Sequence, residues 1–248
     1  MSASKIEWTE QTWNPVTGCT KVSAGCKRRY AERMALRLRP MAAPGHAQGF
    51  GLTPHADRLD QPPRRNKPTV CFARSMADLF HEAVPDDFVD RVFMTVHRTP
   101  RHTDQLPTKR AERLPAFFAA RPAPPNVWLG VTVEDGRHGP PRIDHLRRVP
   151  ARVRFLSVEP LLEDLGPFDP TGIDWVIVGG ESGPDARPMR EEWALSVRDR
   201  CAAAGAAFTF KRWGAWGPDG VRRDQQANGR QLAGRSWDER PELSGALL

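Results

Sequence analysis

Two cysteines near the N-terminus have a spacing that is typical of metal ligands. Cys19 and Cys26 are separated by six residues and lie among Gly, Thr, Ser and Lys. A cysteine three positions later would complete a three-thiolate loop, which can hold a [4Fe–4S] cluster by three irons and leave the fourth open to a ligand. That position holds Arg29, a cation that is normally no ligand. The residues alone leave three interpretations open: a metal-binding loop, a damaged one, or an ordinary loop with two thiols.

Charged side chains follow the apolar runs that we expect to form strands. The runs at 70–73, 127–133, 153–158, 175–178 and 207–210 are mostly continuous, as in strands buried on both faces, and a weaker run lies at 104–107. Because the carboxyl ends of parallel strands meet on one face, we expect the charges after these runs to line a shared pocket. The alternative is that they are charged only because loops are polar. The residues predicted to line the pocket are Asp78, Lys109, Glu134, Glu159 and Lys211.

Among the strand ends, the sequence Gly179-Gly180-Glu181-Ser182 gives the clearest indication of a ligand contact. Two glycines directly after a buried strand permit close approach of a ligand to backbone N–H groups. Glu181 suits a hydrogen bond to an amine or a ribose. The stretch is neither a P-loop nor a dinucleotide fingerprint. We expect these four residues to contact a cofactor or substrate, with a tight turn that binds nothing as the alternative.

The elements that must position these residues alternate along the chain. Helical patterns at 87–98, 109–120, 142–149 and 191–204 separate the strands, and a strand near 5–9 with a helix from Cys26 completes six or seven β-α units. This order predicts an α/β fold with a parallel sheet, and we favour a partial (β/α) barrel over an open doubly wound sheet. We expect one domain over 1–213, with a Pro/Gly-rich excursion at 39–68 as a candidate lid, and a C-terminal extension over 214–248.

The composition bears on partner and compartment. The 248 residues carry a formal net charge of +7, which favours an anionic partner such as nucleic acid or a phosphorylated substrate. The competing explanation is the excess of arginine over lysine that a GC-rich genome imposes on any protein. No apolar run reaches the roughly 18 residues of a membrane span, and no apolar signal core is present, so we expect a cytoplasmic protein that does not enter membranes. The cysteines are then expected to be reduced, with Cys71 and Cys201 as buried small hydrophobes.

Several stretches of the sequence resemble one known family. They include IEWTEQTWNPVTGCTKVSAGCKRRYAERMA at 6–35, NVWLGVTVED at 126–135 and DWVIVGGESGPDARPM at 174–189, with shorter ones at 75–88, 108–114, 152–162, 210–214 and 234–241. On these residues the chain resembles the phage-associated "gene product 37/68" family, a domain of unknown function. The three-cysteine loop and β/α order of that family are similar to those of radical S-adenosylmethionine (SAM) proteins.

The resemblance implies an iron–sulfur enzyme with a [4Fe–4S] cluster and SAM as cofactors, acting on an unknown substrate for which nucleic acid is a candidate. Cys19 and Cys26 match the first two cluster ligands, and Arg29 stands where the family has cysteine. Asp104 and Pro107 depart as well, because the family has apolar strand residues there and proline removes a donor from what should be a central strand.

These departures keep two further hypotheses open. One is a non-catalytic descendant of the fold that binds nucleic acid or a partner protein through its basic surface. The other is a structural zinc site in which Cys19 and Cys26 combine with His46 or His55 from the excursion, although nothing in the sequence fixes that geometry.

Overall fold

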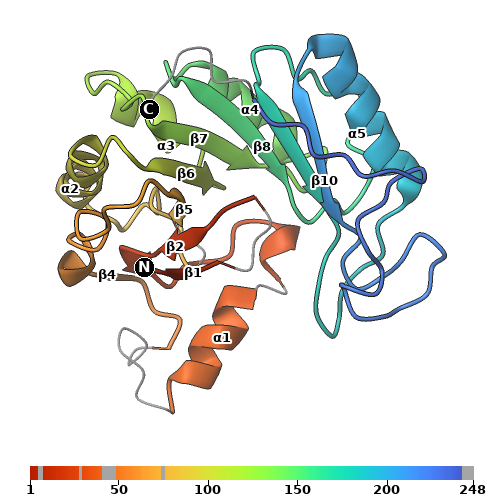
Figure 1. Cartoon of the computed structure of the whole chain (residues 1–248), viewed down its shortest axis with the longest axis horizontal. Coiled ribbons are helices and arrows are strands. Elements are labelled where there is room, and N and C mark those ends of the chain that lie inside the picture. The colour runs from red at the N-terminus through yellow and green to blue at the C-terminus, as the bar shows by residue number, and fades with distance from the viewer. Residues whose placement is uncertain (5–7, 28–29, 41–48, 74–75, 242–248) are drawn as a thin grey trace.

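The computed structural model describes residues 1–4, 8–27, 30–40, 49–73 and 76–241. Its main sheet has eight strands in the order β1-β2-β5-β6-β7-β8-β9-β10 and curls into part of a barrel (Figure 1). The edge strand β1 (Ser2–Ala3) is antiparallel to β2, and the other seven strands run parallel, which confirms the predicted α/β partial barrel. The parallel strands are β2 (Gln11–Trp13), β5 (Val70–Ala73), β6 (Thr103–Thr108), β7 (Val127–Thr132), β8 (Val153–Val158), β9 (Trp175–Gly179) and β10 (Ala207–Arg212).

Four helices follow the outer side of the sheet, and α1 stands apart from them (Figure 1). The α5 helix begins with Glu191 and Glu192, which favour the positive end of the helix dipole, and it ends where Gly205 adopts a left-handed conformation with φ 72°. These signals explain why the predicted helix at 191–204 matches α5. The helices are α1 (Tyr30–Leu38), α2 (Asp86–His97), α3 (Arg113–Phe118), α4 (Gly139–Arg147) and α5 (Glu191–Ala204), with 3-10 turns η1 (Ala24–Cys26) and η2 (Ala56–Arg58).

One predicted boundary near the N-terminus was wrong, and another prediction falls mostly outside the described residues. Residues 5–7 of the expected strand at 5–9 lie outside the described residues, and neither Trp8 nor Thr9 belongs to a strand. Trp8 is buried in the core, so a strand prediction based on apolar residues includes it although it lies in an irregular segment. The expected helix from Cys26 begins later, because Cys26 ends the 3-10 turn η1 and α1 starts at Tyr30.

The interior of the partial barrel is apolar at the beginnings of its strands. Trp128, near the start of β7, and Trp175, the first residue of β9, lie with their ring centroids 5.9 Å apart in an edge-to-face arrangement. Trp8 packs against Trp175 in the same way at 5.7 Å. This inner cluster, which also contains Val153, Phe155 and Ile177, fills the floor of the interior. A separate and larger core cluster combines residues of the strands with residues of the helices.

The central strand β6 continues through Pro107 and the buried Asp104. Pro107 lies in register with Gly130 of β7, whereas the recorded β5–β6 pairing in the described residues ends at Gln105. The missing proline N–H therefore falls beyond that ladder with β5, which explains how the strand tolerates it. Asp104 is 0% exposed, and among the described residues neither of its carboxylate oxygens has a hydrogen-bond partner.

Two irregular segments pack against the barrel. In the described part of the excursion, β4 (Thr53–Pro54) pairs with β3 (Val16–Thr17) as a small antiparallel sheet. The C-terminal segment runs beside β10, where Phe210 N–H donates to Trp237 O at 2.9 Å and Glu239 N–H donates to Phe208 O at 3.2 Å. Within the described ranges, no helix combines the length and apolar character needed to cross a membrane.

Candidate functional site

Glu134 lies at the centre of the strand-end site. It follows β7, and its side chain is fully buried between two cations. Lys109, which follows β6, forms an ion pair with Oε1, and Arg142 of α4 lies 2.5 Å from Oε2. Burial raises the pKa of Glu134, but the charges of Lys109 and Arg142 and hydrogen bonds outweigh it and lower the pKa to about 2. Burial lowers the pKa of Lys109, although the charge of Glu134 opposes that shift.

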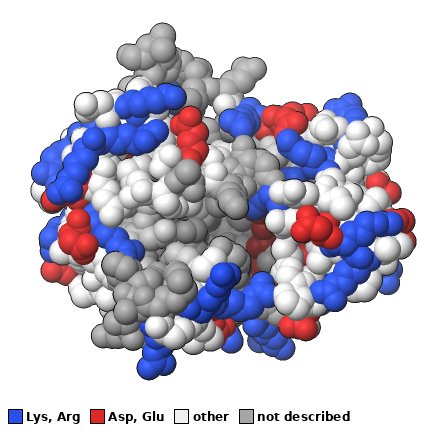
Figure 2. Space-filling view, turned by 60° about the horizontal axis from the view of Figure 1, so that its bottom comes forward, with Lys and Arg blue, Asp and Glu red and all other residues white. Residues whose placement is uncertain are grey.

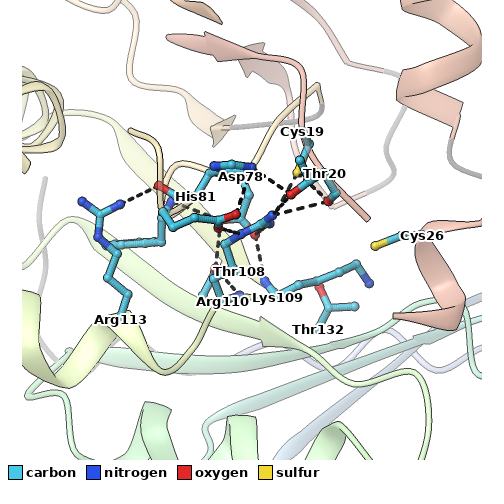
Figure 3. A network of polar contacts seen from close by, with 12 residues as sticks. Cys19, Thr20, Cys26, Asp78, His81, Thr108, Lys109, Arg110, Arg113 and Thr132 are labelled. Carbon is cyan, nitrogen blue, oxygen red and sulfur yellow. Dashed lines mark hydrogen bonds and ion pairs between the residues drawn. The ribbon is translucent and has the colours of Figure 1, made fainter. Parts of the chain in front are cut away.

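The cysteine loop reaches this site through Ser23 and Cys26. Ser23 Oγ donates a 2.5 Å hydrogen bond to Glu134 Oε1, and a Cβ at Gly25 would lie 2.5 Å from the same oxygen. A side chain at position 25 would therefore displace the buried Glu134 side chain. The Lys109 side chain extends toward the buried Cys26 (Figure 3). Burial raises the pKa of Cys26, but the charge of Lys109 and hydrogen bonds from the main chain and Ser23 outweigh burial, so the pKa is lowered.

Asp78 and Arg110 form a second buried polar group beside Cys19. Asp78 accepts hydrogen bonds from Thr108 Oγ1 and from Lys109 N–H, each at 2.9 Å. Its carboxylate also lies 3.7 Å from the Arg110 guanidinium, which donates to Cys19 Sγ at 3.4 Å. The predicted lining residue Asp78 therefore fixes the segment after β6 through its own hydrogen bonds.

Glu159 and Lys211 form a separate pair at the ends of β8 and β10. Lys211 Nζ lies 2.8 Å from Glu159 Oε1, and a Cβ at Gly179 would lie 2.8 Å from the same oxygen. At Gly180 a Cβ would lie 1.9 Å from Trp213 O. Packing against the main chain therefore requires glycine at position 180, whereas a Cβ at position 179 would displace the end of the Glu159 side chain, and the contact of both glycines with a ligand stays a prediction.

Glu181 is occupied by a guanidinium of the chain itself. Its carboxylate accepts hydrogen bonds from Arg187 Nε at 2.8 Å and Nη2 at 2.6 Å, and Arg187 also donates to Ala24 O at 3.2 Å. The segment after β9 is thereby joined to the cysteine loop. Ser182 lies apart and is exposed, and its hydroxyl bonds Gln225 Oε1 at 2.8 Å. It borders a cavity of about 150 Å³ lined by Lys27, Glu32, Arg33, Leu36, Ser182, Gly183 and Asp185.

The structure pairs predicted residues with each other, as Lys109 with Glu134 and Lys211 with Glu159, and it pairs three predicted acids with arginines that the sequence reasoning missed. Arg110, Arg142 and Arg187 are the partners of Asp78, Glu134 and Glu181 respectively. Arg110 directly follows the predicted Lys109 and could have been found from that position. The other two lie on a helix and in an irregular connection, and no strand-end pattern points to them.

The donor set does not fit a [4Fe–4S] cluster held by three thiolates. The chain has four cysteines, of which Cys71 lies in β5 and Cys201 in α5, and both are confirmed as buried. Arg29 and His46 lie outside the described residues, and arginine has no acceptor atom to offer a metal. Nowhere in the described chain do three His, Cys, Asp or Glu side chains form a group that could hold a metal ion. His55 instead forms a 2.8 Å hydrogen bond with Thr17, which does not support the zinc hypothesis.

The fold and the site define a partial (β/α) barrel with a buried polar network at its strand ends. The chain belongs to the family described as "Protein of unknown function (DUF5131)", whose profile matches residues 3–241. The phage association stays a prediction. A comparison with curated proteins finds no match.

Two solved structures of spore photoproduct lyase are similar to this chain. The complex with dinucleoside spore photoproduct has 12% identity and a TM-score of 0.48, over 82% of this chain and 64% of the lyase. A cysteine-to-alanine mutant with the same ligand has 15% identity and a TM-score of 0.49, over 91% and 72%. The chain thus spans 64% of the length of the first lyase structure.

Proposed function

We propose that this protein binds nucleic acid at the open end of its partial barrel, beside the strand-end site. The observation that supports this proposal is the separation of charge between the interior and the rim. Inside, Glu134, Glu159 and Glu181 are each paired with a lysine or an arginine of the chain. Acidic groups that would repel a phosphate are therefore already neutralised by the protein.

The rim carries exposed positive charge on and beside α1. Arg33 and Arg37 are exposed and four residues apart, so they share one side of the helix, and Lys27 is exposed just before it. Glu32 of the same helix forms a 2.9 Å ion pair with Lys21 and is thereby largely compensated. Lys and Arg side chains, with Asp and Glu side chains among them, lie around the margin of the face that Figure 2 shows. The net charge of +7 adds a long-range attraction for phosphates.

Fluorescence anisotropy with labelled single-stranded and double-stranded DNA and RNA tests the proposal over a range of salt concentrations. We expect the logarithm of the binding constant to fall linearly with the logarithm of salt concentration, because each phosphate contact releases counterions. The variants Arg33→Gln and Arg37→Gln should each flatten the slope by about 0.7 to 1. The matched control is Arg98→Gln, at the exposed end of α2, which should leave the slope unchanged. Absence of binding at 50 mM salt would refute the proposal.

A radical-SAM-like enzyme is the second candidate. The observation in its favour is that Cys19 and Cys26 lie beside the polar strand-end network rather than elsewhere in the fold. Its test is anaerobic reconstitution with iron and sulfide, followed by metal analysis, visible absorption near ~400 nm and assay of SAM cleavage to 5′-deoxyadenosine. If neither the natural chain nor Arg29→Cys binds iron, the candidate is excluded for this scaffold.

A further inference from the structure

The loop with the two cysteines is tied to the rest of the site along its length by contacts within the protein. Gly18, the residue before the loop, donates from its N–H to Met76 O at 3.2 Å, and Cys19 N–H donates to Phe50 O at 3.3 Å. Farther along, Ser23 bonds Glu134 and Ala24 O accepts from Arg187, as described above. The loop therefore has protein partners at both of its ends.

Arg110 supplies the anchor between those ends. Its side chain is 4% exposed, and its two terminal nitrogens reach the loop from below (Figure 3). Nη1 donates to Cys19 Sγ at 3.4 Å, while Nη2 donates to Thr20 Oγ1 at 2.6 Å and to Thr20 O at 3.4 Å. On its other edge, Nε donates to Glu82 at 2.6 Å, and the nearby Asp78 carboxylate adds a second negative charge. A planar guanidinium can serve both sides at once because its donors form a rigid fork.

The side chain of His81 also fixes Thr20. His81 Nε2 forms a 2.9 Å hydrogen bond with Thr20 Oγ1, and Ala83 N–H donates to His81 Nδ1 at 3.1 Å. Because the main chain occupies Nδ1 as an acceptor, the ring carries its proton on Nε2 and donates it to the hydroxyl. Thr20 is thus held between two side chains that come from the segments after β5 and β6.

We propose that Arg110 is the positioning residue that orders the Cys19–Cys26 loop in this chain, in the place of an iron–sulfur cluster. A cluster bound by three thiolates would cross-link such a loop through its own ligands. Here the third thiolate is replaced by Arg29, and the cross-links are hydrogen bonds to Arg110, Glu134 and Arg187. The proposal does not depend on nucleic-acid binding, because it concerns only what orders the Cys19–Cys26 loop.

Hydrogen exchange of the full metal-free chain, read by mass spectrometry of peptides, tests this role. We expect Arg110→Gln to speed exchange in peptides covering 19–26 at least tenfold. Arg110→Lys should give an intermediate effect, because a single ammonium cannot contact Cys19 and Glu82 in the same way as the fork. Peptides from α5 report global unfolding and should exchange as in the natural chain. The control Arg121→Gln removes an ion pair with Asp90 of α2 and should change loop exchange less than twofold.

Two results would overturn the proposal. One is loop exchange in Arg110→Gln that equals that of the natural chain. The other is uptake of about four irons per natural chain after anaerobic incubation with iron and sulfide, accompanied by at least tenfold slower loop exchange. If Arg110→Gln does not fold, Thr20→Val is compared with His81→Phe, because Thr20→Val removes the hydroxyl that accepts from both Arg110 and His81, whereas His81→Phe removes only the bond from His81. Thr20→Val is expected to speed loop exchange at least threefold more than His81→Phe does, and equal rates in the two variants count against the proposal.

Discussion

The buried Asp104 makes the stability of this protein depend on pH. Burial raises its pKa from 3.8 to about 7, and neither carboxylate oxygen has a hydrogen-bond partner in the part of the chain that the structure describes. Since the folded state holds this proton more tightly than the unfolded state, the contribution to stability is complete below pH 3.8 and is lost as the pH rises to about 7. The full difference is about 4 kcal/mol in the free energy of unfolding, at about 1.4 kcal/mol per pKa unit.

The substitution Asp104→Asn removes the titration and nearly preserves the shape of the side chain. We expect the free energy of unfolding of the variant, relative to the natural chain, to rise by about 3 kcal/mol between pH 5 and pH 8. Urea denaturation followed by tryptophan fluorescence at several pH values measures this difference. Any cost of burying the amide is independent of pH, so only the change between the two pH values is diagnostic.

The matched control is Asp60→Asn, which removes an exposed carboxylate from an irregular segment. Its difference from the natural chain is expected to be the same at pH 5 and pH 8. Parallel curves of unfolding free energy against pH for Asp104→Asn and the natural chain would refute the reasoning. Such a result would mean that the folded protein provides the carboxylate with water or another partner.

Three further predictions concern the site and the core. Replacing Glu134 by Ala leaves two buried cations without their counter-charge and should lower the free energy of unfolding by about 3 to 5 kcal/mol in urea titrations. Gly180→Ala should lower the melting temperature by several degrees, because its Cβ would overlap a main-chain oxygen, whereas Gly136→Ala, where the nearest atom is 3.4 Å away, should change it little. Cys71 and Cys201 are 0% exposed, and burial raises the pKa of both thiols. Both should therefore react with a thiol reagent only after denaturation. Labelling of either cysteine in the native protein would contradict that burial.

The sequence predicts the strands more closely than the contacts at their ends. The runs 70–73 and 153–158 coincide with β5 and β8, because each is a short apolar stretch bounded by polar residues or proline. The meeting of Lys109 and Glu134 follows from the same reasoning, since neighbouring parallel strands deliver their carboxyl ends to one place. The apolar runs therefore predicted which charged strand ends meet, and the role of these residues in binding or catalysis stays a prediction.

The arginine partners could not be predicted in this way. Arg142 lies on α4, and the direction in which it points depends on how that helix packs against β7 and β8. Arg187 lies in an irregular connection, and it contacts Ala24, which is 163 residues away in sequence. The strand predicted to include Trp8 was wrong at that residue. Trp8 is apolar because it is buried in the inner cluster, and an apolar residue in an irregular segment cannot be told from a strand residue by its type.

The pairing of the C-terminal segment with β10 has a consequence for folding and assembly. An uncovered edge strand is a template for strands of other molecules, and here Trp237, Asp238 and Glu239 occupy part of that edge. During synthesis these residues leave the ribosome only after β10 has emerged, so the newly made sheet passes through a stage in which its outer edge is adhesive. The segment 237–239 therefore keeps this edge of the sheet from pairing with strands of other molecules.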